Sequence, residues 1–482
     1  MTLDDLTRVL AASGTGANGA AEIADLAYDA HRVVPGSVFF CVPGSRVDGH
    51  EFAERAVAVG AIALVVERPL ELDVPQLLVD DARGSMAVAA DAFYGEPTRA
   101  LEVAGVTGTN GKTTSAFLLR SVLQAAGRSP GLVGTVEWVV GGVARPAPHT
   151  TPEAIDLQRL FREMLDAGDE SVAIEASSHG SALRRLDRVR FDALVFTNLS
   201  QDHLDLHGTM ENYYQAKRRL FVGAQPPPAA VNVGDEHGRR LALELAETRR
   251  APLITFGTTD AAEIRPEALE LGPQGSRFRA AGIDVETPLR GRFNVENVLG
   301  VIAAGILLDL DDEAIAEGVR TVRGVPGRFE PVDEGQPFAL IVDYAHTPHA
   351  LDIVLRAARG LGDGRVICVF GAGGDRDRGK RPLMGAVAAE RADVVVVTSD
   401  NPRREDPLAI IQDVLQGAGT GVEIDPDRRT AIGRAVTLAR PGDVVVIAGK
   451  GHEQGQETDG VVMPFDDRVV AREALRAAGF RR

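Results

Sequence analysis

The sequence predicts an α/β protein of three domains built around mostly parallel sheets. Short apolar runs rich in valine and isoleucine alternate with helical patterns along the chain, as is typical of parallel strands covered by helices on both faces. The chain has 482 residues, and at about 150 residues per domain this length favours three domains. It contains no internal repeat and no low-complexity segment.

The first block covers residues 1–98 and is expected to form a small N-terminal α/β domain. Its end is marked by the turn-rich stretch Gly95–Thr98, which follows a helical pattern over Ser85–Tyr94. Buried strands are predicted in this block at Ser37–Val42 and Ala61–Glu67.

The second block (99–326) and the third block (327–482) repeat strand–helix units. The stretch Glu270–Leu289 differs, because it has the pattern of an antiparallel ribbon. The strands predicted in the second block are Leu101–Val106, Ser171–Ala176 and Ala193–Thr197. Those predicted in the third block are Phe338–Asp343, Val366–Phe370, Asp393–Thr398 and Asp443–Ala448.

The overall composition is that of an ordinary globular protein, with 44% hydrophobic and 25% charged residues. A net charge of −17 argues against a broad nucleic-acid or membrane surface, although a local basic pocket remains compatible with it. The two cysteines, Cys41 and Cys368, lie in apolar runs and are predicted to be buried thiols. Because no signal peptide and no run of about 18 apolar residues is seen, we expect a cytoplasmic protein.

The strongest motif is the segment Gly105–Thr114, which follows a buried strand and opens a helix. Glycines there let backbone N–H groups surround phosphate oxygens, and the helix N-terminus adds positive charge. The strict phosphate-loop spacing would need glycine at Val106, so the loop is a variant; a glycine-rich turn without ligand is the alternative. The motif predicts ATP contacts at Gly108, Thr109, Asn110, Gly111, Lys112, Thr113 and Thr114.

Acids and histidines follow two further predicted strands. Glu175 ends a buried strand, and ligands of open α/β sheets bind at the carboxyl ends of strands, so Glu175 is placed to hold Mg²⁺. Three histidines, His179, His203 and His207, lie near acids downstream of the loop, which favours a functional role for at least one of them. Lys217, taken alone, is expected to be a solvated lysine on a helix with other surface basic residues.

Together these segments resemble the Mur ligases, the amide-forming enzymes of peptidoglycan precursor synthesis, over nearly the whole chain. The resemblance implies a central P-loop-type domain flanked by an N-terminal UDP-sugar-binding domain and a C-terminal, Rossmann-like, amino-acid-binding domain. It implies catalytic roles for Lys112, Lys217, His203 and Glu175. It also implies Mg²⁺ held by Thr113, Glu175, His203 and Lys217, with Lys217 carrying a carbamate derived from CO₂.

Further motifs match the family in collinear order. By resemblance, Asn294 contacts adenine and Arg328 reaches the nucleotide from the third domain. Asp343 begins the segment Asp343–Pro348, which is similar to a loop that closes on ATP. Alone, such an asparagine or arginine would be expected on the surface; the shared order with the other motifs favours a role at the nucleotide.

The third block is most similar to family members that add meso-diaminopimelate. Asp400-Asn401-Pro402-Arg403 resembles the motif that binds this amino acid, and Arg403 could hold its distal carboxylate bidentately. A lysine-adding enzyme has no need of that contact. The resemblance implies amino-acid contacts at Arg376, Asp400, Asn401, Pro402, Arg403, Gly449 and Glu453.

Contacts to a UDP-sugar substrate match less completely. Ala30 stands where the family has a hydroxyl, and Leu183 stands where the diaminopimelate-adding enzymes tend to have glutamine. The implied contacts are Tyr28, Ala30, Ser45, Arg46, Val47, His149, Thr150, Thr151, Ser177 and Arg185.

The function expected from the resemblance is ATP-dependent addition of meso-diaminopimelate to UDP-MurNAc-L-Ala-D-Glu through an acyl phosphate. The chain is expected to act as a monomer, without nucleic-acid or membrane partners. Alternatives with the same chemistry are a lysine-adding ligase, a pentapeptide-forming ligase and a folylpolyglutamate synthase. Arg403 disfavours the first of these, and the segment Asp48-Gly49-His50 disfavours the last. A nucleotide-binding regulatory protein without ligase turnover is a further alternative, which the intact Lys112, Glu175, His203 and Lys217 disfavour.

Overall fold

The computed structural model describes residues 1–482 except 16–18, 45–46, 249, 273 and 482. The chain forms two compact units. The first unit consists of Met1–Gly105, Arg128–Ala193 and Val222–Pro227, and the second consists of Val106–Gly127, Leu194–Phe221 and Pro228–Arg482. Among the described residues, no helix has both the length and the apolar character needed to cross a bilayer.

The N-terminal part of the first unit contains a five-stranded sheet in the order β1-β5-β4-β3-β2, parallel except for β1. One face of the sheet buries Val38 and Phe40, and the other buries Phe39 and Cys41. The alternation follows from the two-residue period of a strand. The elements are α1 (Leu3–Leu10), β1 (Ser13–Thr15), β2 (Asp25–Ala27), β3 (Ser37–Phe40), α2 (Ala53–Ala58), β4 (Ala63–Val66), β5 (Gln76–Leu78) and α3 (Ala82–Phe93), with 3₁₀ turns at Gly49–Phe52 and Pro97–Arg99.

The rest of the first unit is a second strand ladder with helices. In it β10 pairs in parallel with β7, and β7, β8 and β9 form an antiparallel meander. The amide of Glu102, at the start of β6, donates to the carbonyl of Glu170 just before β10 (3.1 Å). The elements are β6 (Glu102–Thr107), β7 (Pro130–Val133), β8 (Glu137–Val140), β9 (Val143–Pro146), α5 (Ala154–Asp166), β10 (Ser171–Glu175) and α6 (Ser178–Ala182).

The second unit begins with the end of β6 and the helix α4 that follows it. Strands β11, β12 and β13 are parallel, and β14, β15 and β16 form the antiparallel ribbon that the sequence predicts. The elements are α4 (Lys112–Ala125), β11 (Ala193–Phe196), α7 (Leu204–His207), α8 (Met210–Arg218), β12 (Ala229–Asn232), α9 (Glu236–Thr248), β13 (Leu253–Phe256), β14 (Glu267–Gly272), β15 (Gly275–Ala280), β16 (Ile283–Thr287), α10 (Arg292–Leu307) and α11 (Asp312–Thr321).

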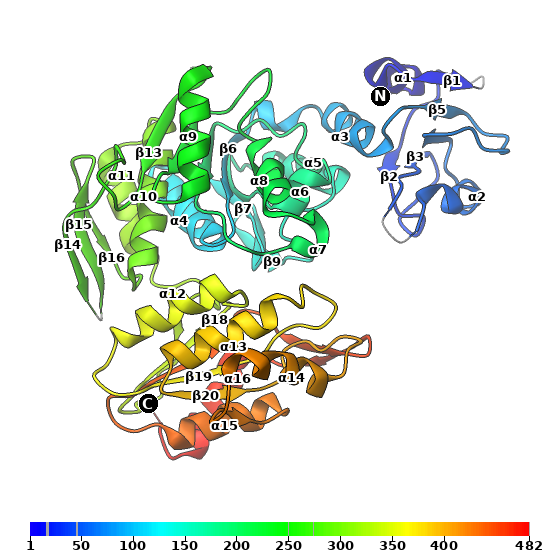
Figure 1. The fold of residues 1–482 in the computed structure, drawn as a ribbon. Coiled ribbons are helices and arrows are strands. Elements are labelled where there is room, and N and C mark those ends of the chain that lie inside the picture. Colours follow the sequence, from blue (N-terminus) through cyan, green and yellow to red (C-terminus); the bar gives the residue numbers. More distant parts are fainter. Residues whose placement is uncertain (16–18, 45–46, 249, 273, 482) are drawn as a thin grey trace. The chain divides into compact units, whose positions relative to one another are not determined.

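The C-terminal part of the second unit is a six-stranded sheet in the order β17-β18-β22-β19-β20-β21, parallel except for β17. Helices α12 and α13 cover one face of this sheet and α15 covers the other (Figure 1). The elements are β17 (Glu330–Pro331), β18 (Ala339–Asp343), α12 (Pro348–Arg359), β19 (Val366–Phe370), α13 (Lys380–Arg391), β20 (Val394–Val397), α14 (Pro407–Ala418), β21 (Glu423–Ile424), α15 (Arg428–Leu438), β22 (Val444–Ala448), β23 (Gly455–Thr458), β24 (Val461–Pro464) and α16 (Asp467–Ala477).

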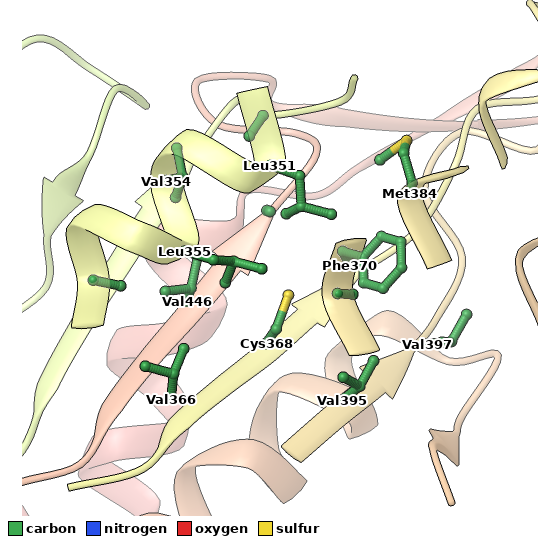
Figure 2. Packing of buried hydrophobic residues seen from close by; sticks show 14 of the residues in the cluster. Leu351, Val354, Leu355, Val366, Cys368, Phe370, Met384, Val395, Val397 and Val446 are labelled. Carbon is green, nitrogen blue, oxygen red and sulfur yellow. The ribbon is translucent and has the colours of Figure 1, made fainter. Parts of the chain in front are cut away.

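The C-terminal core confirms the prediction of buried parallel strands. Cys368 of β19 lies among Leu355, Val366 and Val446, and Phe370 lies near Met384 (Figure 2). The cysteines are buried and reduced, as predicted. Burial in apolar surroundings raises the pKa of each cysteine thiol to about 12, because the thiolate form is poorly solvated there.

Candidate functional site

The phosphate-type loop lies in the second unit between β6 and α4. Gly108 has a φ of +150° and Gly111 a φ of +87°, and Gly111 is the N-cap residue of α4. A Cβ atom at Gly108 would overlap the Thr197 side chain, and one at Gly111 would overlap Asn297. Both glycines are therefore required by backbone conformation and by close packing.

The segment after β11 supports this loop through hydrogen bonds. Asn198 Oδ1 accepts from the Asn110 amide (3.0 Å), and Thr197 Oγ1 donates to the Asn110 carbonyl (2.6 Å). The Ser200 amide donates to Thr109 Oγ1 (3.0 Å), which also lies 3.0 Å from the hydroxyl of Tyr213. These bonds fix the conformation of the loop.

Two lysines converge on the loop carbonyls. Lys112 Nζ donates to Gly108 O (2.9 Å) and Thr109 O (2.8 Å), and Lys217 Nζ donates to Gly108 O (2.7 Å). Lys217 is only 1% exposed and lies 4.8 Å above the Tyr213 ring. Burial, reinforced by the charge of Lys112, holds the pKa of Lys217 well below the usual lysine value.

The expectation of a solvated Lys217, drawn from that residue alone, is wrong. The face of α8 that carries Tyr213, Tyr214 and Lys217 is buried. Lys217 belongs to this inward face, whereas the half-buried Arg218 and the exposed Arg219 point in other directions round the helix, and only the packing of α8 decides this. The position is consistent with the role that the resemblance implies.

Arg328 reaches the start of α4 from the third block. Its Nη2 donates to Thr113 Oγ1 (2.9 Å), and its guanidinium lies 4.4 Å from the centre of the Tyr344 ring. Asp343 accepts from the Phe329 amide (2.6 Å) and the Ala345 amide (2.7 Å), so it ties the Arg328 segment to the loop after β18. Burial raises the pKa of the Asp343 carboxyl.

Asn294, predicted to contact adenine, is 4% exposed at the start of α10. Its Nδ2 donates to the Arg290 carbonyl (2.8 Å), and its Oδ1 accepts from Asn297 Nδ2 (3.0 Å). Since Asn297 is also the residue packed against Gly111, Asn294 connects to the phosphate-type loop through one neighbour. The adenine contact itself stays a prediction.

An acid that the sequence analysis did not select lies beside His203. Asp202 is 6% exposed, and its Oδ2 lies 3.3 Å from His203 Nε2 and 3.7 Å from His346 Nε2. Burial opposes ionisation of this carboxyl, but the hydrogen bond and charge of His346 and the charge of His203 together lower its pKa. His207 instead stacks on Tyr213, with ring centroids 5.0 Å apart.

Glu175 lies in the first unit at the end of β10 and is 1% exposed. Its Oε1 accepts from the Thr135 amide (2.7 Å) and its Oε2 from the Thr135 hydroxyl (3.0 Å). These bonds orient both carboxylate oxygens, as the outer partners of metal-binding carboxylates do. Thr135 was not selected from the sequence, since a lone threonine after a strand carries no distinguishing pattern.

Four of the residues predicted to contact the UDP-sugar lie together beside Glu175. Thr151 Oγ1 donates to the Glu175 carbonyl (2.8 Å) and lies 2.9 Å from Ser177 Oγ, and Arg185 Nη1 donates to the Thr151 carbonyl (2.8 Å). The hydroxyl of Thr150 lies 3.0 Å from that of Thr135. This cluster presents hydroxyl groups and a guanidinium, which suit a polar anionic ligand.

The remaining UDP-sugar predictions are spread over the first unit. The Tyr28 hydroxyl donates to Asp156 (2.6 Å), and Ala30 is packed in the apolar cluster of the N-terminal sheet. Val47 and His149 are exposed. Leu183 caps α6 at its C-terminus. Ser45 and Arg46 lie outside the described residues.

The predicted amino-acid contacts gather at the carboxyl ends of β20 and β22. Asn401 Nδ2 donates to Glu453 Oε2 (2.8 Å), and the fully buried Lys450 donates to Asn401 Oδ1 (2.9 Å) and Glu453 Oε2 (3.0 Å). A Cβ atom at Gly449 would overlap the Asp400 carboxylate, so the two strand ends are in close contact. Lys450 was missed by the sequence analysis although it lies within the motif.

Both predicted arginines lie near Gly373, because a Cβ atom built there would meet the side chains of Arg403 and Arg376. Arg403 is half-buried, and its Nη1 donates to the Gly374 carbonyl (2.7 Å). The buried Pro402 stands against Gly374, where a Cβ atom would overlap its carbonyl. Arg376 is exposed. Within the described part of the chain, no three or more His, Cys, Asp or Glu side chains form a group that could hold a metal ion.

Comparisons with known proteins agree with this architecture. Three family models match in order: "Mur ligase family, catalytic domain" over 22–105, "Mur ligase middle domain" over 106–305 and "Mur ligase, glutamate ligase domain" over 327–451. The chain belongs to the Mur ligase family. The resemblance and the fold class expected from the sequence are thereby confirmed.

Similar proteins carry one name. A UDP-N-acetylmuramoyl-L-alanyl-D-glutamate–2,6-diaminopimelate ligase of Solibacter usitatus is 48% identical over 95% of this chain and 94% of its own length. The protein of the same name from Geobacillus kaustophilus is 46% identical, with 96% of each chain covered. A solved structure of a ligase with this name has 33% identity and a TM-score of 0.70, covering 99% of both chains.

A more distant Mur-type structure shares the fold. Folylpolyglutamate synthase of Mycobacterium tuberculosis, in a structure complexed with ADP and AMPPCP, has a TM-score of 0.64 at 19% identity over 83% of this chain. At that identity the likeness shows the fold alone.

Proposed function

We propose that this Mur ligase is an ATP-dependent amide-forming enzyme that adds meso-diaminopimelate to UDP-MurNAc-L-Ala-D-Glu. The observation that carries the specificity is the segment Asp400–Arg403. Within it Asn401 is hydrogen-bonded to Lys450 and Glu453, and the half-buried guanidinium of Arg403 donates to the Gly374 carbonyl. A guanidinium suits the distal carboxylate of a diamino diacid, and a carboxylate such as that of Glu453 suits an ammonium group. The relatives named for this reaction support the assignment.

The reaction proposed has two steps. An oxygen of the D-glutamate γ-carboxylate attacks the γ-phosphorus of ATP, and the bond from that phosphorus to the bridging oxygen breaks, which releases ADP. The amino group of the diamino acid then attacks the acyl carbon, loses a proton and expels inorganic phosphate. We assign to the loop amides and Lys112 the neutralisation of charge that develops on the phosphoryl oxygens, and preorganised donors of this kind lower the barrier.

The family implies Mg²⁺, and each unit taken by itself contains oxygen ligands of the kind that such an ion prefers. Glu175 is a buried carboxylate held at both oxygens by Thr135, and Thr113 presents a hydroxyl at the first turn of α4. Bound Mg²⁺ would neutralise phosphate charge. Lys217 fits a carbamate, because burial lowers its pKa and so favours the neutral amine, the form that reacts with CO₂.

The function is tested by phosphate release from ATP and Mg²⁺ in the presence of UDP-MurNAc-L-Ala-D-Glu. We expect turnover with meso-diaminopimelate and little with L-lysine or L-ornithine. Equal turnover with lysine would keep the ligase chemistry and reject the role of Arg403 in specificity. Absence of turnover with every acceptor would reject the proposed substrate and direct attention to Ala30 and Leu183.

The carbamate proposal has a separate test. Lys217→Ala should lower kcat by about 100-fold or more, as loss of a metal-positioning group does. The wild-type enzyme should lose activity in CO₂-free buffer and regain it on addition of bicarbonate. Full activity of Lys217→Ala in CO₂-free buffer would contradict the role proposed for this lysine.

ATP and UDP-linked sugars are cytoplasmic metabolites, so we propose that the protein acts in the cytoplasm. We propose a monomer of 51.1 kDa as the active species. Sedimentation at micromolar concentration checks this, and a dimer mass that persists on dilution would contradict it.

A further inference from the structure

The β23–β24 hairpin has no part in the function proposed so far. It is a two-stranded antiparallel ribbon, and its outer strand exposes Val461, Val462 and Met463 to solvent. A two-stranded ribbon of this kind is weakly stable by itself. Its inner strand, however, is attached to the segment Asp400–Arg403.

Four hydrogen bonds join β23 and its turn to that segment. Gln456 Nε2 donates to the Asp400 carbonyl (2.7 Å), and the Glu457 amide donates to Asn401 Oδ1 (3.1 Å). The Arg403 amide donates to the Glu457 carbonyl (3.0 Å), and the Asp459 amide donates to the Arg403 carbonyl (2.6 Å). The hairpin therefore holds both the backbone and a side chain of the predicted amino-acid motif.

The backbone of Arg403 needs such support. Its φ of +54° lies in the left-handed region, which costs a residue other than glycine about 1 kcal/mol. The two backbone bonds to Glu457 and Asp459 bracket Arg403 and offset this cost. In the left-handed conformation the side chain leaves the segment on the side of Gly374, whose carbonyl accepts from Arg403 Nη1.

The guanidinium of Arg403 is held at two of its three nitrogens. Nη1 donates to Gly374 O at 2.7 Å, and Nε lies 3.4 Å from Glu457 Oε2. Among the described residues, Nη2 has no partner within hydrogen-bonding distance. A planar fork fixed in this way presents Nη2 and the remaining hydrogen of Nη1 to a carboxylate.

We propose that Gln456 and Glu457 are positioning residues for recognition of the distal carboxylate of the amino-acid substrate. Gln456 fixes the position of the Asp400–Arg403 backbone through its hydrogen bond to the Asp400 carbonyl. Glu457 fixes the orientation of the Arg403 guanidinium through its contact with Nε. The inference rests on the function proposed above, since it assumes that Arg403 receives that carboxylate. It adds that the selectivity for a diamino diacid depends on the hairpin as well as on the motif.

The test uses two nearly isosteric substitutions in the full-length enzyme, Glu457→Gln and Gln456→Met. Each should raise the KM for meso-diaminopimelate about fivefold, the size expected for the loss or weakening of one hydrogen bond. The KM values for ATP and for UDP-MurNAc-L-Ala-D-Glu should change less than about twofold, and so should kcat. The ratio of kcat/KM for meso-diaminopimelate over L-lysine should fall.

Glu473→Gln is the matched control, because Glu473 pairs with Arg429 on the surface of the same domain and is 52% exposed. It should leave every kinetic constant unchanged. A purely structural role of the hairpin would lower kcat and the melting temperature and raise all three KM values together, and that result would overturn the inference.

The two proposals fail in different ways. Wild-type enzyme without turnover on meso-diaminopimelate would overturn the proposed function and this inference together. A wild-type enzyme that uses meso-diaminopimelate, with Glu457→Gln and Gln456→Met variants of unchanged KM, would overturn the inference alone.

Discussion

Lys217 illustrates how a single buried amine is constrained. Its side chain is enclosed by the loop carbonyl of Gly108 and the ring of Tyr213, with Lys112 nearby. An ammonium group in such a place loses hydration and meets a like charge, so the neutral amine is favoured. The same feature that makes the residue reactive toward CO₂ reduces the stability of the fold at neutral pH.

Lys217→Met should therefore stabilise the protein in CO₂-free buffer at pH 7. The folded-state pKa is lowered, so the unfolded chain binds one more proton than the native chain between that pKa and 10.5. The penalty is absent above pH 10.5 and grows as the pH falls. We expect a gain of about 1 kcal/mol, or about 3 °C in melting temperature, that shrinks toward pH 10.5. A gain that is constant from pH 7 to 10.5 would contradict this explanation.

Arg428 and Asp467 form an ion pair with both side chains 0% exposed. Arg428 also donates to the carbonyls of Ser399 (3.2 Å) and Ala448 (2.9 Å). These two residues directly precede Asp400 and Gly449, which are predicted to contact the amino-acid substrate. Burial works against the charge, but Asp467 raises the pKa of Arg428.

Arg428→Met should destabilise the protein by about 3–5 kcal/mol, because the Asp467 charge is left buried and unpaired. The double variant Arg428→Met/Asp467→Leu should recover most of that loss, although two carbonyls lose a donor at about 1 kcal/mol each. Urea unfolding followed by circular dichroism checks both values. A double variant as unstable as the single one would show that the carbonyl contacts dominate.

Helix α4 and its preceding loop form one functional element. Two glycines with positive φ flank the helix: Gly111 at +87° at its N-terminus and Gly127 at +79° beyond its C-terminus. Their surroundings differ, because a Cβ at Gly111 meets Asn297, whereas Gly127 has open space around it. Substitutions at these two glycines therefore distinguish the effect of a steric clash from the effect of backbone strain.

Gly127→Ala should cost about 1 kcal/mol through its backbone conformation and leave ATP affinity unchanged. Gly111→Ala carries the same strain and also pushes Asn297 away from the loop. We expect it to weaken ATP binding by about tenfold or more, measured by fluorescence titration of a nucleotide analogue. Equal ATP affinity in the two variants would show that the close contact has no role.

At the scale of the whole molecule, binding of Mg²⁺-ATP is expected to increase the free energy of unfolding. A ligand that binds only the native state at about 100 times its dissociation constant contributes about 2.7 kcal/mol. Mg²⁺-ATP should therefore raise the melting temperature of the wild-type protein measured by calorimetry. In Lys112→Ala this increase in melting temperature should nearly vanish, because the lysine that neutralises the phosphate charge is missing. An unchanged shift in that variant would place ATP elsewhere.

The sequence by itself determined the α/β class, some of the buried strands, the phosphate loop and the family. These follow from local causes, since apolar runs of strand length and glycines at fixed spacing keep their meaning in any surroundings. The collinear motifs located Asn401, Arg403 and Glu453, which lie after the carboxyl ends of β20 and β22. The sequence offered no local signal for Thr135 or Lys450.

Only the tertiary structure decided which polar side chains are buried and what they face. Lys217 has the same local pattern as its solvated neighbours, yet the packing of α8 turns it inward. Asp202, Arg428 and Gln456 acquire their partners from segments distant in the chain. Contacts of that kind depend on how whole elements pack, and a linear pattern of residues does not encode them locally.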